Sequence, residues 1–182
     1  WHSFMSSTGS MASMVSAAVH TYESAEVREN AAEDNKKCVK IVSTPVKFMG
    51  MVIASANGTI TTGRLKAGDM NASSKDNCSF LDFSSTDVDA NGDPFYAVLN
   101  NKPDAMKVWV KFKAGDGNKN PKATISALLT NGNMVQDPED DKYAANIIAR
   151  ANNSSIESKD EWQEITIPFT YDNAEEMPKA AL

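Results

Sequence analysis

The stretch Lys107-Val108-Trp109-Val110-Lys111-Phe112-Lys113 alternates polar and apolar side chains almost perfectly, with Trp109 in a polar position of the pattern. Successive side chains of a β-strand point to opposite faces, so the two valines and the phenylalanine share one face. Trp109 then lies on the other face, among the three lysines. The pattern predicts a half-buried strand whose solvent face carries an indole ring.

Other segments extend this period-two pattern over most of the chain. Pro168 cannot donate to a strand ladder, so it predicts an edge strand or a bulge. The Asn57-Gly58 pair predicts a hairpin turn, because both residue types tolerate positive φ. Helical periodicity is weak, and only residues 25–32 and 137–145 favour short helical turns. The further strands are predicted at residues 38–43, 46–54, 59–65, 123–129, 146–151 and 165–171.

The length, net charge and apolar content of the chain exclude several classes of function. The 182 residues fit one domain over 1–182, with a polar entry segment at residues 6–16. The formal net charge of −6 argues against a nucleic-acid-binding surface and against a polybasic membrane segment. No apolar run approaches the roughly 20 residues of a transmembrane helix.

Cys38 and Cys78 are compatible with one disulfide or with two buried thiols. Because the chain begins at Trp1, we expect a mature or excised piece whose targeting segment is absent here.

Several short motifs together resemble a known family. They are Trp1-His2-Ser3-Phe4, Asp93-Pro94-Phe95, residues 102–112, residues 147–151 and residues 161–171. In this order they are similar to the carbohydrate-metabolism (glycan-binding) domain of surface lipoproteins from Bacteroidetes bacteria. The resemblance covers nearly the whole chain. It implies an all-β jelly-roll sandwich of the galactose-binding-like type, and no defined catalytic residues.

The resemblance also implies an extracytoplasmic location at the cell surface or in the periplasm. The lipid anchor would lie in a segment absent here, and the role would be polysaccharide utilization. In the family a closing strand rich in Asp and Val follows the strand at 162–171. Here the sequence ends as Ala180-Ala181-Leu182 begins such a strand. We therefore expect the closing strand to be missing, or to be supplied by another chain pairing near Leu182.

The candidate ligand residues are Trp109, Lys111, Arg150 and Tyr96. Sugar rings stack their CH faces on an aromatic ring while cationic side chains bond the hydroxyls. We expect the strand of Arg150 to bring it near Trp109, and Tyr96 to rim the site. Each has a simpler alternative: a loop or the N-terminal segment covers Trp109, Arg150 is a solvated surface residue, and Tyr96 packs in the core.

The acidic loop contains a second candidate. Asp87, Asp89, Asn91 and Asp93 place oxygen ligands at every second position, with glycine at the sixth, as at the start of an EF-hand loop. The twelfth position is Val98, where a bidentate glutamate is needed. The loop is therefore a candidate calcium site of another type, or a turn whose Asx side chains bond their own backbone.

Catalytic patterns are weak. The sequence has two histidines, His2 and His20, both near its start, and no Gly-x-Ser-x-Gly elbow. Acidic residues are abundant, but nothing selects a pair for glycoside hydrolysis. Together with the family resemblance, this predicts a non-catalytic glycan-binding module with no cofactor except the candidate calcium. The alternatives are a structural or adhesive surface module and, less favoured, a glycoside hydrolase or accessory domain.

Overall fold

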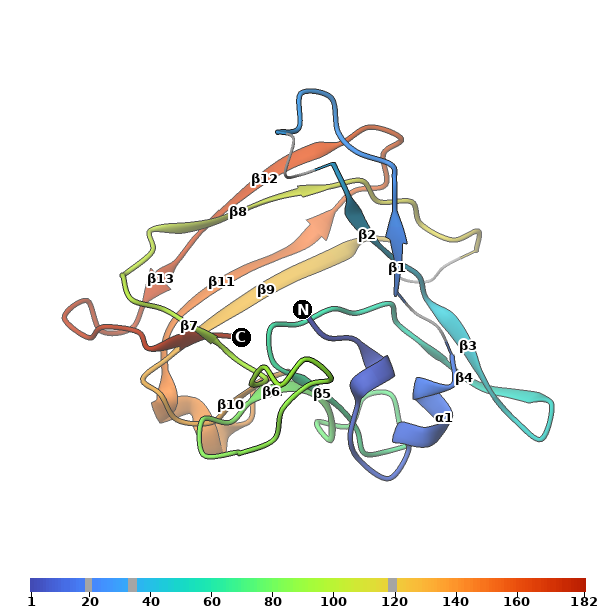
Figure 1. Ribbon diagram of the computed structural model, residues 1–182, viewed down its shortest axis with the longest axis horizontal. Helices are drawn as coiled ribbons and strands as arrows, with labels where there is room; N and C mark the ends of the chain where they lie inside the picture. Colours follow the sequence, from blue (N-terminus) through green and yellow to red (C-terminus); the bar gives the residue numbers. More distant parts are fainter. Residues whose placement is uncertain (19–20, 33–35, 118–120) are drawn as a thin grey trace.

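A computed structural model describes residues 1–18, 21–32, 36–117 and 121–182 (Figure 1). The described part consists mainly of antiparallel β-structure, so the all-β prediction is confirmed. The helical segments among the described residues are short, namely η1 (Phe4–Ser6), α1 (Ala12–Ser16) and η3 (Asp141–Asn146). The strands are β1 (Thr21–Ser24), β2 (Cys38–Ile41), β3 (Thr44–Phe48), β4 (Met51–Ala56), β5 (Arg64–Ala67), β6 (Asn77–Leu81), β7 (Ala97–Val98), β8 (Ala105–Val110), β9 (Ala123–Thr130), β10 (Val135–Asp137), β11 (Ile147–Ile156), β12 (Gln163–Pro168), β13 (Thr170–Tyr171) and β14 (Ala180–Ala181).

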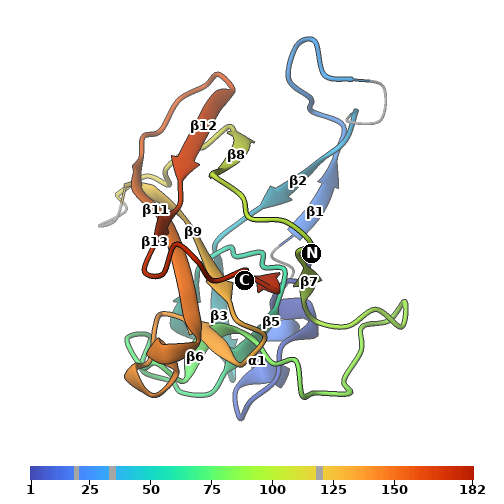
Figure 2. The same cartoon turned by 90° about the vertical axis from the view of Figure 1, so that its left-hand side faces the viewer.

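The largest sheet has the order β13-β11-β9-β14-β7. Its two long strands, β9 and β11, lie between the β8–β12 pair and the β10-β6-β5 sheet (Figures 1 and 2). Ala127 and Leu128 are successive residues of β9, so their side chains point to opposite faces. Ala127 packs toward Ile167 of β12, and Leu128 packs with Leu81 of β6 and Val135 of β10. The central sheet is therefore covered by other strands on both faces.

The strand predicted around Trp109 is present as β8, and it pairs with β12 in antiparallel register. Pro168 lies opposite Ala105 at the end of this pair. The ladder breaks at Phe169, whose N–H donates to the Asp104 carbonyl oxygen at 2.9 Å. The chain then pairs with β11 as β13. In the described part, β12 pairs with β8 alone, as the edge position predicted for Pro168 requires.

The single strand predicted at residues 46–54 is wrong, because β3 and β4 form a hairpin there. Its turn is Met49-Gly50, and both residues have positive φ (48° and 83°), as the central residues of a type I′ turn do. The predicted Asn57-Gly58 hairpin is also wrong. β4 ends before this pair, and the next strand begins only at Arg64.

The start of the chain is more ordered than its polar composition predicts. The His2 N–H donates to the Thr61 carbonyl oxygen at 2.8 Å, and the Met11 N–H donates to that of Ala67 at 2.9 Å. The α1 helix lies within residues 6–16, which we expected to be a loose entry segment. Residues 25–32 form no helix. Of the helical turn expected at 137–145, the second half is helical, because η3 begins at Asp141.

The strand at Ala180-Ala181 differs from the open edge expected near Leu182. It lies between β9 and β7 and pairs with both. The Leu182 N–H also donates to the Leu128 carbonyl oxygen at 2.9 Å. Because both edges of β14 are paired within the chain, the expected pairing with another chain at this strand is wrong.

Both cysteines are free thiols, Cys38 partly exposed and Cys78 buried. Of the two alternatives left by the sequence, the disulfide is therefore not formed. None of the helices in the described ranges has the length and apolar character needed to cross a membrane.

Candidate functional site

Trp109 lies on the outer face of the β8–β12 pair, as its place in the alternating stretch predicts. Its side chain is 40% exposed, whereas Met106 on the opposite face of β8 packs against the core. Glu164 of β12 is directly across from Trp109 and forms an ion pair with Lys107. The indole therefore lies on a surface of charged side chains, not inside the apolar interior.

A loop from the start of the chain reaches this surface. It follows β1 and contributes Glu26 and Arg28, and the β1–β2 hairpin stands beside the β8–β12 pair (Figure 2). The Arg28 guanidinium carbon is 4.7 Å from the centroid of the Trp109 ring, and Glu26 forms an ion pair with Lys111. The alternative that a loop covers Trp109 thus holds in part, because the ring is partly covered and partly exposed.

Two hydrogen bonds of its own backbone hold Glu26 in position. The Cys38 thiol donates to the Glu26 carbonyl oxygen at 2.8 Å, and the Glu26 N–H donates to Ser24 Oγ at 3.2 Å. These bonds tie the loop to both strands of its own hairpin. The hydrogen bond from Lys111 to Glu26 raises the pKa of Lys111.

The Trp109 surface, defined here as Trp109, Lys111, Glu26, Arg28 and Glu164, combines one aromatic ring with two cations and two carboxylates. Such a set offers a flat apolar face together with charged hydrogen-bond donors and acceptors. Sequence reasoning missed Glu26, Arg28 and Glu164. Glu26 is 85 residues from Lys111, and no local pattern in its segment indicates a contact over that separation.

Arg150 does not join this surface, so the expectation that it lies near Trp109 is wrong. It belongs to β11, on the face that also carries Leu128. Its guanidinium donates from Nε and Nη2 to the two carboxylate oxygens of Glu139, each at 2.8 Å, and forms an ion pair with Asp172. These bonds, led by those to Glu139, raise the pKa of Arg150. Arg150 links two loops while its side chain is 34% exposed, so the alternative of a solvated surface arginine holds in part.

Tyr96 is part of the core, in agreement with the alternative given for it. Its ring stacks on Phe83 with the centroids 4.2 Å apart and the planes at 19°. Both rings pack against the cluster that contains Leu81 and Leu128. Tyr96 therefore packs on the face of the central sheet that carries Leu128, opposite to the face that packs against β12.

The acidic loop has the hydrogen bonds of an Asx turn. Asp89 Oδ1 accepts from the N–H groups of Asn91 at 2.8 Å and Asp93 at 3.0 Å. These bonds, that from Asp93 first, lower the pKa of Asp89. Asp87 forms an ion pair with Arg64. Within the described ranges no group of three or more His, Cys, Asp or Glu side chains is placed to hold a metal ion, and calcium binding here stays a prediction.

Comparison of the chain with protein-family models, with curated proteins and with solved structures finds no match.

Proposed function

We propose that this chain is a non-catalytic glycan-binding module that stacks a sugar ring on Trp109. The observation that carries the proposal is the half-exposed indole on the outer face of β8, surrounded by charged side chains. A sugar ring has one or both faces lined with CH groups, which pack on an aromatic ring with loss of water from both surfaces. An exposed aromatic ring on a rigid strand suits this contact, because little conformational entropy is lost on binding.

The charged neighbours supply the directional part of the proposed binding. Arg28 and Lys111 donate to sugar hydroxyls, and Glu26 and Glu164 accept from them. Arg28 lies over part of the ring in the free protein. A bound sugar takes the exposed part of the indole, or displaces Arg28 from it. In either case Arg28 borders the sugar and affects its affinity.

The wider setting of the proposal comes from the sequence motifs. They favour a jelly-roll sandwich of the galactose-binding-like type on an extracytoplasmic bacterial surface, held there by a lipid anchor outside this sequence. The antiparallel sheets packed on both faces of β9 and β11 support the all-β class, and the jelly-roll type is part of the proposal. Fold similarity alone does not establish a ligand, so the proposal depends on the Trp109 surface.

Calorimetric titration of soluble polysaccharides and oligosaccharides into the wild type and into Trp109→Ala tests the proposal. The substitution removes the stacking surface, and we expect the affinity for the bound glycan to fall at least about tenfold, equivalent to about 1.4 kcal/mol. Trp109→Phe keeps an aromatic face and should retain part of the affinity. Trp1→Ala is the matched control, because Trp1 is 80% exposed and lies outside the Trp109 surface.

Two results would contradict the proposal. One is that the wild type binds no glycan in a broad panel. The other is that Trp109→Ala and Trp1→Ala bind with equal affinity, which would place the ligand elsewhere.

One observation favours a second candidate, a structural or adhesive module. The tip of the β3–β4 hairpin exposes four apolar side chains, namely Phe48 (52%), Met49 (85%), Met51 (66%) and Val52 (60%). Contiguous exposed apolar groups are typical of surfaces that contact another macromolecule. A wild type that binds no glycan but self-associates through this tip would favour the second candidate over the first.

A further inference from the structure

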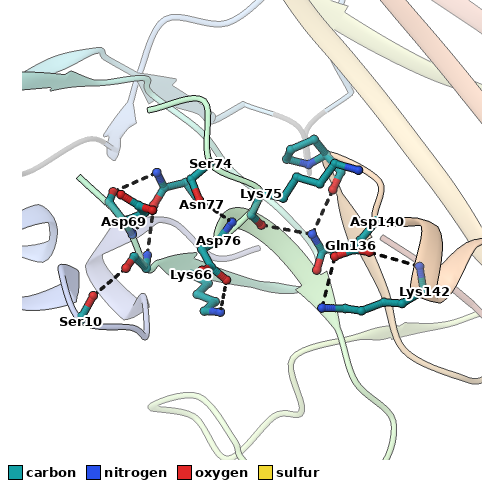
Figure 3. Close-up of polar contacts among 12 residues, drawn as sticks. Ser10, Lys66, Asp69, Ser74, Lys75, Asp76, Asn77, Gln136, Asp140 and Lys142 are labelled. Carbon is teal, nitrogen blue, oxygen red and sulfur yellow. Dashed lines mark hydrogen bonds and ion pairs between the residues drawn. The ribbon is translucent and has the colours of Figure 1, made fainter. Parts of the chain in front are cut away.

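A cavity of about 310 Å³ lies between the β10-β6-β5 sheet and the 3-10 helix η3. Its volume is at the lower end of the range found for small-molecule sites, which is about 300–1,000 Å³. Figure 3 shows the polar side chains of this region. Those used below are Lys66, Lys75, Asp76, Gln136, Asp140 and Lys142, all of which line the cavity.

Gln136 is the buried polar group of the cavity wall, with 5% of its surface exposed. Its amide nitrogen donates to the carbonyl oxygens of Lys75 at 3.2 Å and Pro138 at 3.1 Å, which fixes the orientation of the amide (Figure 3). No described residue donates a hydrogen bond to the side-chain oxygen Oε1, and this atom keeps some contact with solvent. An acceptor held in this way favours a ligand that donates a hydrogen bond, such as a hydroxyl group.

The cavity is lined by more positively charged than negatively charged side chains. Lys66 Nζ is 2.8 Å from Asp76 Oδ1, and Lys142 Nζ is 3.2 Å from Asp140 Oδ2. Lys75 forms no ion pair with a described carboxylate, although it is close enough to Asp140 to interact with it. The cavity thus has one more cation than anions, in a chain with a net charge of −6. This local excess favours a ligand with one negative charge.

The cavity also has apolar walls. Phe80 of β6 and Tyr143 of η3 line it, and Lys142 Nζ lies 4.7 Å from the centroid of the Tyr143 ring. Aromatic surface next to paired donors and acceptors suits the CH groups and hydroxyls of a sugar. A phosphate or sulfate ion would use the lysines but would leave these walls uncovered.

We infer that this cavity is a second carbohydrate site, which takes a single sugar ring bearing a carboxylate, a uronic acid. The carboxylate pairs with Lys75, and one hydroxyl donates to Gln136 Oε1. The other hydroxyls bond the Asp76 and Asp140 carboxylates and the Lys66 and Lys142 ammonium groups. The inference rests on the proposed glycan-binding function for its ligand class, but it concerns residues separate from the Trp109 surface.

Two-dimensional NMR titration of the ¹⁵N-labelled chain with digalacturonic acid tests this site, and neutral galactobiose serves as the matched ligand. We expect the acidic disaccharide to shift the amide signals of residues 75, 136 and 143, and the neutral one to bind at least about tenfold more weakly. Lys75→Gln should remove that preference and its salt dependence, because it removes the unpaired cation. Lys159→Gln is the control, since this exposed lysine lies outside the cavity.

Trp109→Ala separates this inference from the proposed function. Cavity signals that respond to the acidic disaccharide in this variant as in the wild type support a second site. The inference is overturned by any of three results: no response of the cavity signals, equal effects of Lys75→Gln and Lys159→Gln, or uronate binding that is lost in Trp109→Ala. Loss of uronate binding in Trp109→Ala would instead support the proposed function, with the acidic sugar bound at the Trp109 surface.

Discussion

The β9–β11 pair and the β3–β4 hairpin are both antiparallel, yet they differ in what covers them. Leu129 and Ala149 of the first pair are fully buried, and both faces of their sheet are packed. In the hairpin only Val46 is buried, and the tip exposes apolar side chains on a two-stranded sheet. An isolated two-stranded hairpin is marginally stable in water. The comparison indicates that the stability of the chain resides in the central sheet.

The same contrast applies to function. The Trp109 surface combines β8, which packs on the central sheet, with a loop of the peripheral β1–β2 hairpin. Loops on rigid scaffolds carry binding residues more often than the scaffold itself does. In the proposed binding, the central sheet fixes the position of the indole, and the hairpin loop contributes Glu26 and Arg28.

The largest effect on the free energy of unfolding is expected for a substitution in the central sheet. Leu129→Ala removes a fully buried side chain and should lower the free energy of unfolding by about 3 kcal/mol, through lost transfer energy and a residual cavity. Urea denaturation followed by circular dichroism measures this. Val98→Ala is the control, because Val98 is 59% exposed, and its change should stay within about 0.5 kcal/mol. Equal losses in the two variants would contradict the packing described here.

A smaller effect is expected at the hairpin. Met49 has a φ of 48°, a region that asparagine tolerates better than methionine does. Met49→Asn should leave the free energy of unfolding unchanged or raise it by at most about 0.5 kcal/mol. The same denaturation experiment measures it. A loss above 1 kcal/mol would mean that the Met49 side chain makes contacts that its 85% exposure does not indicate.

Local sequence patterns predicted the strands whose alternation is regular. Residues 107–113, 123–129 and 165–171 correspond to β8, β9 and the β12–β13 segment. The β3–β4 hairpin was not predicted because methionine is an unusual residue at a positive φ, and because the turn lies at the start of the apolar stretch from Met49 to Ala54. The Asn57-Gly58 pair misled the prediction, since turn chemistry permits a hairpin but does not require one.

The candidate site was predictable only where one strand determines it. The outward position of Trp109 follows from the alternation of its neighbours. The contact with Arg28 does not, because it depends on how a distant hairpin packs. The prediction that Arg150 lies near Trp109 was wrong for the same reason. Its face depends on pairing with Leu128 and on a register shift between Ile147 and Ala149, which one sequence does not reveal.

Tryptophan fluorescence tests most directly whether a sugar covers the indole of β8. In the double variant Trp1→Phe, Trp162→Phe, Trp109 is the one remaining tryptophan. We predict that a glycan identified by calorimetry shifts its emission to shorter wavelength and protects it from acrylamide quenching, because the exposed part of the ring leaves water. Unchanged emission and quenching at saturating glycan would contradict the claim that Trp109 binds the sugar.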